Sequence, residues 1–487
     1  MASAAAAAIL PITETAATRM TAGAAGKIVR WTKNSLARNK QAMIDPSNFS
    51  RVLAPPVLDL ARDVSLRLQD QRSQVEKLQD YVTKSLEGGS LGSVSQENID
   101  PNVGTPTAEK NKKVIATSSQ PYWWNQLQKE EKTMMTSEER QKRRQALEKA
   151  RQNLHNLNKL HENTQEIAET FWAHLETNKM ENPVLDKREQ KWLKATFRQI
   201  RDRHALTVED LAEFAITTRP YWDPALPLDD TVMDFLRGRM GVQLLCEHAL
   251  SPKGMIYKDC HLLSVLEDAT NEAQLLCESH YSHLVTAAPE VVIVTQTIDR
   301  SDEFTIVQPW IHYVLVELLK NAMAVSMERM TKEMEASSCS NVLPPTIFIA
   351  IDDHHDEEDK SYLSIDVLDQ GGGFKNPDLA QNTDILFDFV RTKKTMWDRL
   401  DDQQTYAETR SPMQGLGVGL CLSRLMMQHF GGTVELASHP PLSLRKKQSL
   451  IGDSSVVDSL EAGCIASIKL LKDLDHKEPL YASDDDE

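Results

Sequence analysis

The residue pair that could do chemistry most directly is an acid and an amide placed four positions apart. Glu317 and Asn321 lie in the segment Glu317-Leu-Leu-Lys-Asn321-Ala-Met323, inside a predicted helix from about 309 to 335. Because residues i and i+4 share a helix face, the carboxylate and the carboxamide should project about one turn apart. Such a face can hold a cation together with a water or a hydroxyl group. The exposed polar stripe of an amphipathic helix gives the same pattern.

A first glycine-rich segment follows a predicted strand over 361–368. It reads Asp369-Gln-Gly371-Gly-Gly373-Phe. Glycines allow the backbone to approach a flat ligand, and a carboxylate at a strand end can accept a hydrogen bond from the exocyclic amine of adenine. A glycine-rich turn that merely ends a strand is the simpler alternative.

A second glycine-rich segment opens a predicted helix over 420–430. Its residues are Gly415, Leu416, Gly417, Val418, Gly419 and Leu420. Free backbone N–H groups and the positive end of a helix dipole suit a polyphosphate. A Rossmann dinucleotide site is a poor match, because its glycines would follow the first strand and precede a ribose-binding acid by about 20 residues. In this order, the three segments predict a nucleotide site more specifically than any one alone.

The elements that position these segments fall into a helical half and a sheet half. Amphipathic helices are expected over 137–176, around 192–204, and over 229–250 and 260–283, which an antiparallel bundle accommodates. After Pro289, strands are expected over 290–298, 346–352, 361–369, 433–437 and 464–471. The predicted fold class is therefore α+β: a four-helix bundle over 137–288, then an α/β sandwich over 289–475 with a helix layer on one face of a mixed sheet.

Composition narrows the class of protein. The 487 residues carry 55 Lys plus Arg against 71 Asp plus Glu, a net charge of −16, which argues against a broad nucleic-acid surface. No run approaches the ~18 apolar residues of a membrane span. The 6 cysteines form no CxxC pair, which argues against a disulfide framework or a Cys-rich zinc site. The segment Asp352–Asp359 contains metal-ligand residue types, and a solvated hairpin tip explains it more simply.

The first 44 residues differ in kind from the rest. Against one acid, Glu14, they hold the basic residues Arg19, Lys27, Arg30, Lys33, Arg38 and Lys40. An Ala-, Ser- and Thr-rich cationic segment predicts a mitochondrial transit peptide over 1–44, with a disordered leader or a plastid address as alternatives. Residues 45–136 are predicted to be variable and partly disordered around a plausible helix over 58–84, and 476–487 form an acidic tail.

Taken together, the three segments resemble the N, G1 and G2 boxes of the GHKL ATP-binding superfamily, which includes type II topoisomerases and sensor histidine kinases. The match can be narrowed with Ile200-Arg-Asp-Arg-His204, Leu275-Leu-Cys-Glu-Ser-His-Tyr281 and Pro412-Met-Gln-Gly-Leu-Gly-Val-Gly-Leu420 followed by Ser423-Arg424. Over about 145–475 the chain is similar to the mitochondrial protein kinases that act on 2-oxoacid dehydrogenase complexes.

The resemblance implies a role for each site residue. Glu317 would be the base that orients or activates a serine hydroxyl, Asn321 would ligate Mg²⁺, and Asp369 would bind adenine. The remaining nucleotide contacts would come from Gly371, Gly373, Thr392, Gly415, Leu416, Gly417, Val418, Gly419 and Leu420. Asp388 falls where the family holds a K⁺ ion, and the stretch between Gly373 and Gly415 would form a mobile ATP lid.

The implied function is that of an ATP-dependent protein serine kinase in the mitochondrial matrix. It would phosphorylate and inactivate the E1 component of a 2-oxoacid dehydrogenase complex, dock on the lipoyl domain of E2 and form a homodimer. Tyr313 and Pro412-Met413 favour the branched-chain type over the pyruvate type. A GHKL ATPase, a histidine-kinase-like protein with His204 as phosphoacceptor, and a catalytically inactive nucleotide-binding regulator remain as alternatives. Two departures from the family pattern bear on the site, Gln370 for Arg and Cys464 for Thr.

Overall fold

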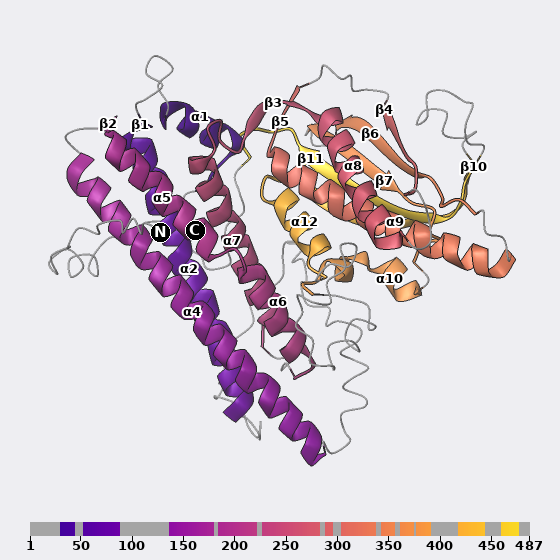
Figure 1. Ribbon diagram of the computed structural model, residues 1–487, viewed down its shortest axis with the longest axis horizontal. Helices are drawn as coiled ribbons and strands as arrows, with labels where there is room; N and C mark the ends of the chain where they lie inside the picture. The colour runs from indigo at the N-terminus through magenta and orange to yellow at the C-terminus, as the bar shows by residue number, and fades with distance from the viewer. Residues whose placement is uncertain are drawn as a thin grey trace, which may run out of the picture.

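A computed structural model describes residues 30–43, 52–87, 136–179, 184–221, 226–282, 288–295, 303–337, 342–355, 361–374, 376–390, 417–443 and 459–476. Figure 1 shows a long helical bundle beside a layer of helices and strands. The α+β class predicted from the sequence is confirmed by this arrangement. Among the helices of the described ranges, none is long and apolar enough to span a membrane.

The longest helix of the bundle is α4 (Ser137–Lys179). The other bundle helices are α2 (Ala54–Glu87), α5 (Lys187–Arg203), α6 (Thr207–Thr218) and α7 (Leu228–Leu250). Helix α2 lies along both α4 and α7, and α4 also contacts α5 and α6. The apolar stripe of α2 supplies Leu68, Val75 and Leu78, which are all fully buried. Burying such a stripe stabilises the bundle by roughly 1.5–3 kcal/mol per large side chain.

The composition of the bundle corrects the predicted domain limits in two places. Helix α2 belongs to the bundle, although the sequence analysis placed it in the variable segment before residue 137. Helix α8 (Leu262–Tyr281), expected as the fourth bundle helix, packs instead against α9 (Gln308–Ser337). The physical reason is that an amphipathic stripe predicts a buried face but not the partner that covers it.

The second half contains a five-stranded sheet in the order β4-β6-β7-β11-β8. The strands are β4 (Val291–Thr295), β6 (Ile347–His355), β7 (Ser361–Leu368), β8 (Thr433–His439) and β11 (Gly463–Leu471). Only β4 and β6 pair in parallel; the other three pairings within this sheet are antiparallel. Leu363, Ile365 and Val367 alternate along β7 and are buried in the same core as α8 and α9. The predicted strands and the two predicted helices of this half are confirmed.

Several short elements were not predicted. Strand β3 (Tyr257–His261) pairs with β5 (Glu303–Ile306), β1 (Val52–Leu53) with β2 (Val184–Leu185), and β9 (Leu442–Ser443) with β10 (Ser459–Leu460). Two short helices, α10 (Pro377–Gln381) and η3 (Thr383–Phe387), follow the first glycine-rich loop. Helix α12 (Gly419–Gln428) follows the second.

The segment 30–43 is part of the fold rather than a separate leader. Trp31 and Leu36 are buried, and the indole N–H of Trp31 donates to Asp63 at 2.8 Å. Two lysines of helix α1 (Lys33–Met43) donate hydrogen bonds to backbone carbonyls: Lys33 to Leu471 at 2.8 Å and Lys40 to His248 at 2.9 Å. The sequence analysis assigned these residues to a transit peptide over 1–44, whereas the structure packs residues 30–40 against the rest of the chain. Residues 1–29 lie outside the described ranges.

Candidate nucleotide-binding site

The centre of the site is the carboxylate of Glu317 on α9. Its Oε1 accepts a hydrogen bond from the ammonium group of Lys320 at 2.8 Å, one turn further along the same helix. The two side chains are 18 % and 10 % exposed, so this ion pair is largely shielded from solvent. A partly buried pair is screened less by salt than a surface pair, and it fixes the orientation of the carboxylate.

The second glycine-rich segment meets this carboxylate directly. A Cβ atom built on Gly419 would fall 2.2 Å from Oε2 of Glu317, so a side chain at this position requires the Glu317 carboxylate to move. Gly419 is the first residue of α12, and Gly417 before it has φ of +76°, a conformation that favours glycine. The N-terminus of α12, where N–H groups are available to an anion, therefore opens beside Glu317.

Asp369 is buried at the end of β7, with 8 % of the residue exposed. Its Oδ1 accepts hydrogen bonds from the backbone N–H groups of Gly371 at 2.8 Å and Cys464 at 3.2 Å. Burial raises the pKa of Asp369, while these two hydrogen bonds act in the opposite direction. Because they engage Oδ1, Oδ2 is the oxygen suited to accept from an exocyclic amine.

The loop after Asp369 is packed tightly against its neighbours. A Cβ atom on Gly371 would lie 2.8 Å from the side chain of Val325 on α9, and one on Gly463 would lie 1.8 Å from the backbone oxygen of Asp369. Gly373 has φ of +72°, which favours glycine. The close approach of this loop to α9 brings the first glycine-rich segment onto the helix that carries Glu317.

Two further predicted residues stand at the margin of the site. Asn321 is exposed, one turn after Glu317, so its amide oxygen is free of the core. An exposed amide oxygen is a ligand type that suits Mg²⁺, which usually keeps several waters and binds substrate phosphates. Asp388 lies directly after η3, and its backbone N–H donates to Ile385 at 3.4 Å. Its assignment to K⁺ stays a prediction.

Not every predicted site residue can be placed. Thr392, Gly415 and Leu416, and most of the expected lid, lie outside the described residues. Val418 is buried and Leu420 half-buried at the start of α12. Within the described ranges, no group of three or more His, Cys, Asp or Glu side chains could hold a metal ion. In the segment Asp352–Asp359, which contains metal-ligand residue types, Asp353 forms an ion pair with Lys472.

His204, the residue considered as a phosphoacceptor, is a core residue of the bundle. It is 1 % exposed, and its ring lies 4.4 Å from the ring of His161 in an edge-on contact. Burial, followed by the charges of His161 and Arg239, lowers the pKa of His204 to about 2. A ring enclosed in this way is not accessible to the phosphate of a nucleotide, which argues against His204 as a phosphoacceptor.

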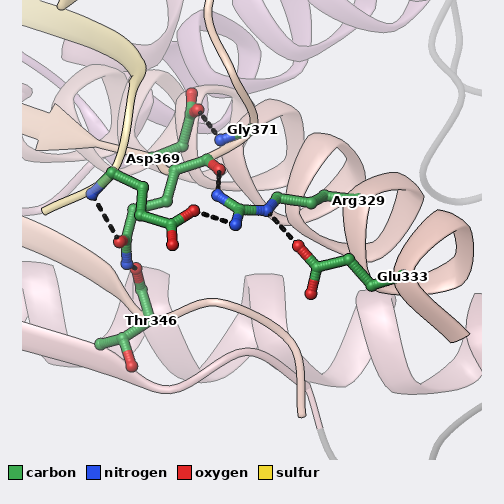
Figure 2. A network of polar contacts seen from close by, with 7 residues as sticks. Arg329, Glu333, Thr346, Asp369 and Gly371 are labelled. Carbon is green, nitrogen blue, oxygen red and sulfur yellow. Dashed lines mark hydrogen bonds and ion pairs between the residues drawn. The ribbon is translucent and has the colours of Figure 1, made fainter. Parts of the chain in front are cut away.

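The sequence analysis did not identify the residues of α9 that contact Glu317 and the loop after Asp369. Lys320 lies within the quoted Glu317–Met323 segment but was given no role, and Val325 and Arg329 lie further along the helix. Arg329 contacts the loop after Asp369 and the segment before β11 (Figure 2). One sequence signal could have pointed to Arg329. Where the family pattern has Arg, this chain has Gln370, so a positive charge near this loop would have to come from another residue.

Comparisons with known proteins find a matching family model and several similar proteins. Residues 306–458 match the family model described as histidine kinase-, DNA gyrase B-, and HSP90-like ATPase. A mitochondrial pyruvate dehydrogenase (acetyl-transferring) kinase of Schizosaccharomyces pombe is 27 % identical over 255 residues, which cover 49 % of this chain and 54 % of the relative. The Arabidopsis thaliana kinase of the same name is 27 % identical over 213 residues, covering 42 % and 52 %.

A third relative is the Drosophila melanogaster kinase of that name, 26 % identical over 260 residues, covering 49 % of this chain and 57 % of the relative. The chain thus spans about half the length of the curated relatives it matches. The resemblance to the GHKL superfamily and to the mitochondrial 2-oxoacid dehydrogenase kinases, predicted from the motifs, is confirmed by these similarities.

Proposed function

We propose that this chain is an ATP-dependent protein serine kinase of the mitochondrial 2-oxoacid dehydrogenase kinase type. The observation that carries the proposal is the contact between the Glu317 carboxylate and the backbone of Gly419. This contact supports a role for Glu317 as a base beside the helix end where the phosphates of ATP would bind. The similarity to pyruvate dehydrogenase kinases supports the same assignment.

Phosphoryl transfer needs positioning and charge stabilisation more than covalent chemistry from the protein. In the proposed reaction, Glu317 accepts a hydrogen bond from the substrate serine hydroxyl and takes its proton as the oxygen attacks the γ-phosphorus. The bond from the γ-phosphorus to the β,γ-bridging oxygen breaks in the same step, and ADP leaves with that oxygen. The N-terminal N–H groups of α12 receive the phosphates, and Oδ2 of Asp369 accepts from the adenine amine. Mg²⁺ held by Asn321 would supply charge neutralisation on the phosphate oxygens. Asp388 would contribute to a K⁺ site beside the nucleotide.

The proposed substrate is the E1 component of a 2-oxoacid dehydrogenase complex in the mitochondrial matrix, with the lipoyl domain of E2 as docking partner and a homodimer as the working form. The named relatives act on pyruvate dehydrogenase. In this chain, Tyr313, one turn before Glu317 on α9, and the sequence Pro412-Met413 favour the branched-chain complex.

The experiment that tests the proposal is transfer of radiolabelled phosphate from ATP to purified complexes. The branched-chain and pyruvate complexes are each incubated with the chain, with and without their E2 cores, and labelled residues are identified by mass spectrometry. We expect phosphoserine on E1, faster with E2 present and faster with the branched-chain complex. Labelling of neither E1 would overturn the proposed function, whereas faster labelling of the pyruvate complex would overturn only the substrate preference.

A further inference from the structure

A network of polar contacts joins the far half of α9 to the loop that follows Asp369 (Figure 2). Its centre is Arg329, whose Nη1 donates to the backbone carbonyl of Gln370 at 2.6 Å and whose Nε donates to Glu333 at 2.7 Å. Nη2 forms an ion pair with Glu461, in the short turn before β11. All three nitrogens of the guanidinium group are thus engaged, although 24 % of the side chain remains exposed.

Gln370 extends the same network to a third segment. Its amide nitrogen donates to the backbone carbonyl of Thr346 at 2.9 Å, and its amide oxygen accepts from the backbone N–H of Glu461 at 3.1 Å. Gly372 also donates to the carbonyl of Ala462 at 2.9 Å. The loop is therefore tied to α9, to the start of β6 and to the turn before β11.

These ties converge on the carboxylate expected to recognise adenine. Gln370 is the residue directly after Asp369, and Asp369 holds its own orientation through the N–H groups of Gly371 and Cys464. Gly371 in turn lies against Val325, one helical turn before Arg329 on the same face of α9. A planar cation that donates to a carbonyl and two carboxylates in fixed directions is well suited to hold such a loop in place.

We propose that Arg329 is a positioning residue that sets the carboxylate of Asp369 for selection of the 6-amino group of adenine. The inference rests on the proposed binding of ATP. Arg329 does not touch the nucleotide in this assignment; it acts through the backbone of Gln370. With Arg329 removed, Glu333 and Glu461 lose their shared cation and the loop loses its tie to α9, so the carboxylate is no longer held at one distance from the purine ring.

The test compares the binding of Mg-ATP with that of Mg-ITP, whose base carries a carbonyl in place of the amine. Binding of each nucleotide is measured by titration calorimetry for the wild type, Arg329→Met and Lys332→Met. Lys332 is a matched control because it lies on the same helix and is 62 % exposed in an ion pair with Glu328. Its replacement removes the same charge without touching the loop.

We expect the wild type and Lys332→Met to prefer ATP over ITP at least about 10-fold, the discrimination that one good polar contact gives. Arg329→Met should lose most of that preference through weaker ATP binding, with ITP affinity changed less than about threefold. In activity assays its KM for ATP should rise while kcat at saturating ATP stays close to wild type. Arg329→Lys should recover part of the preference, because one ammonium can still reach the Gln370 carbonyl.

Glu461→Gln provides a second variant at an exposed position, in case Arg329→Met fails to fold. It should reduce the preference for ATP partially and in the same direction. An unchanged ATP-to-ITP ratio in both Arg329→Met and Glu461→Gln would overturn the positioning role. Absence of ATP binding by the wild type would instead overturn the proposed function, so the two failures are distinguishable.

Discussion

The Glu317 carboxylate on α9 and the Gly419 backbone on α12 lie so close that a methyl group added to Gly419 would collide with the carboxylate. A Cβ on Gly419 would stand 2.2 Å from one carboxylate oxygen and 3.0 Å from the carboxylate carbon. The contact joins two segments separated by about a hundred residues into one site. It accounts physically for the glycine that opens α12.

Gly419→Ala should therefore displace the Glu317 carboxylate, because the new methyl group cannot share its space. We expect the phosphorylation rate to fall by about 100-fold, the usual effect of a misplacement of about 1 Å in an active site. The rate is measured with labelled ATP and the preferred E1. As a control, Gln428→Ala at the other end of the same helix should keep the wild-type rate. Wild-type activity in Gly419→Ala would show that the carboxylate is not used where it lies.

The stability of the bundle should decrease in mild acid. Burial lowers the pKa of His161 to about 4 and that of His204 to about 2. The unfolded chain takes up protons near pH 6.5, whereas these folded rings stay neutral. The stabilisation is fully present above that pH and is lost as the pH falls, by about 1.4 kcal/mol per pH unit for each ring.

Urea unfolding at pH 7.5 and pH 5.5 measures this loss. In His204→Gln the decrease between the two values should be smaller than in the wild type, because one excluded protonation is gone. His155, exposed on the same helix as His161, provides the control, and His155→Gln should retain the wild-type decrease. An equal decrease in His204→Gln and the wild type would contradict the assignment.

The segment 30–43 should be needed for stability. A chain that begins at residue 30 serves as the reference for the melting temperature. Removal of residues 1–43 should lower it by more than about 5 °C, because Trp31 and Leu36 leave the core and the Lys33 contact with Leu471 is lost. Calorimetry of the two truncated chains decides the matter, and identical melting temperatures would show that α1 is dispensable.

Much of the fold follows from local patterns. Alternation over 361–368 predicted β7 because Leu363 and Ile365 face one core, and α9 was expected within two residues of its limits. Periodicity could not predict which element packs against each apolar face. The apolar stripe of α8 fits a bundle as well as it fits α9, its observed partner, and α2 was not assigned to the bundle although it packs against α4 and α7. Lys33 and Lys40 contributed to the prediction of a cationic leader, whereas in the structure their ammonium groups donate hydrogen bonds to the buried carbonyls of Leu471 and His248.

The sequence predicts the residue types of the candidate site, but it could not predict the contacts that hold these residues in position. The spacing of Glu317 and Asn321 on one helix follows from the period of the helix. The contact between Gly419 and Glu317, and the tie from Arg329 to Gln370, depend on how α9 packs against two loops that are distant in sequence. Such contacts are set by tertiary packing, which no local window of the sequence contains.

Asn321→Ala should weaken nucleotide binding through the metal. We expect wild-type ATP affinity to fall when Mg²⁺ is chelated, since Asn321 would hold the ion that neutralises the charge of the phosphates. The variant should bind ATP weakly and almost equally with and without chelator. The measurement is titration calorimetry in the two buffers. A wild-type dependence on Mg²⁺ in the variant would remove Asn321 from the metal site.

Glu317→Gln distinguishes a role of Glu317 in phosphate transfer from a role in nucleotide binding. The amide keeps the shape of the side chain but cannot accept a proton, so transfer should fall by at least about 100-fold. Heat of ATP binding and phosphoserine formation on E1 are measured on the same preparation. We expect wild-type ATP affinity together with this loss of transfer; transfer at the wild-type rate, or lost ATP binding by a folded variant, would contradict the role of Glu317 as the base.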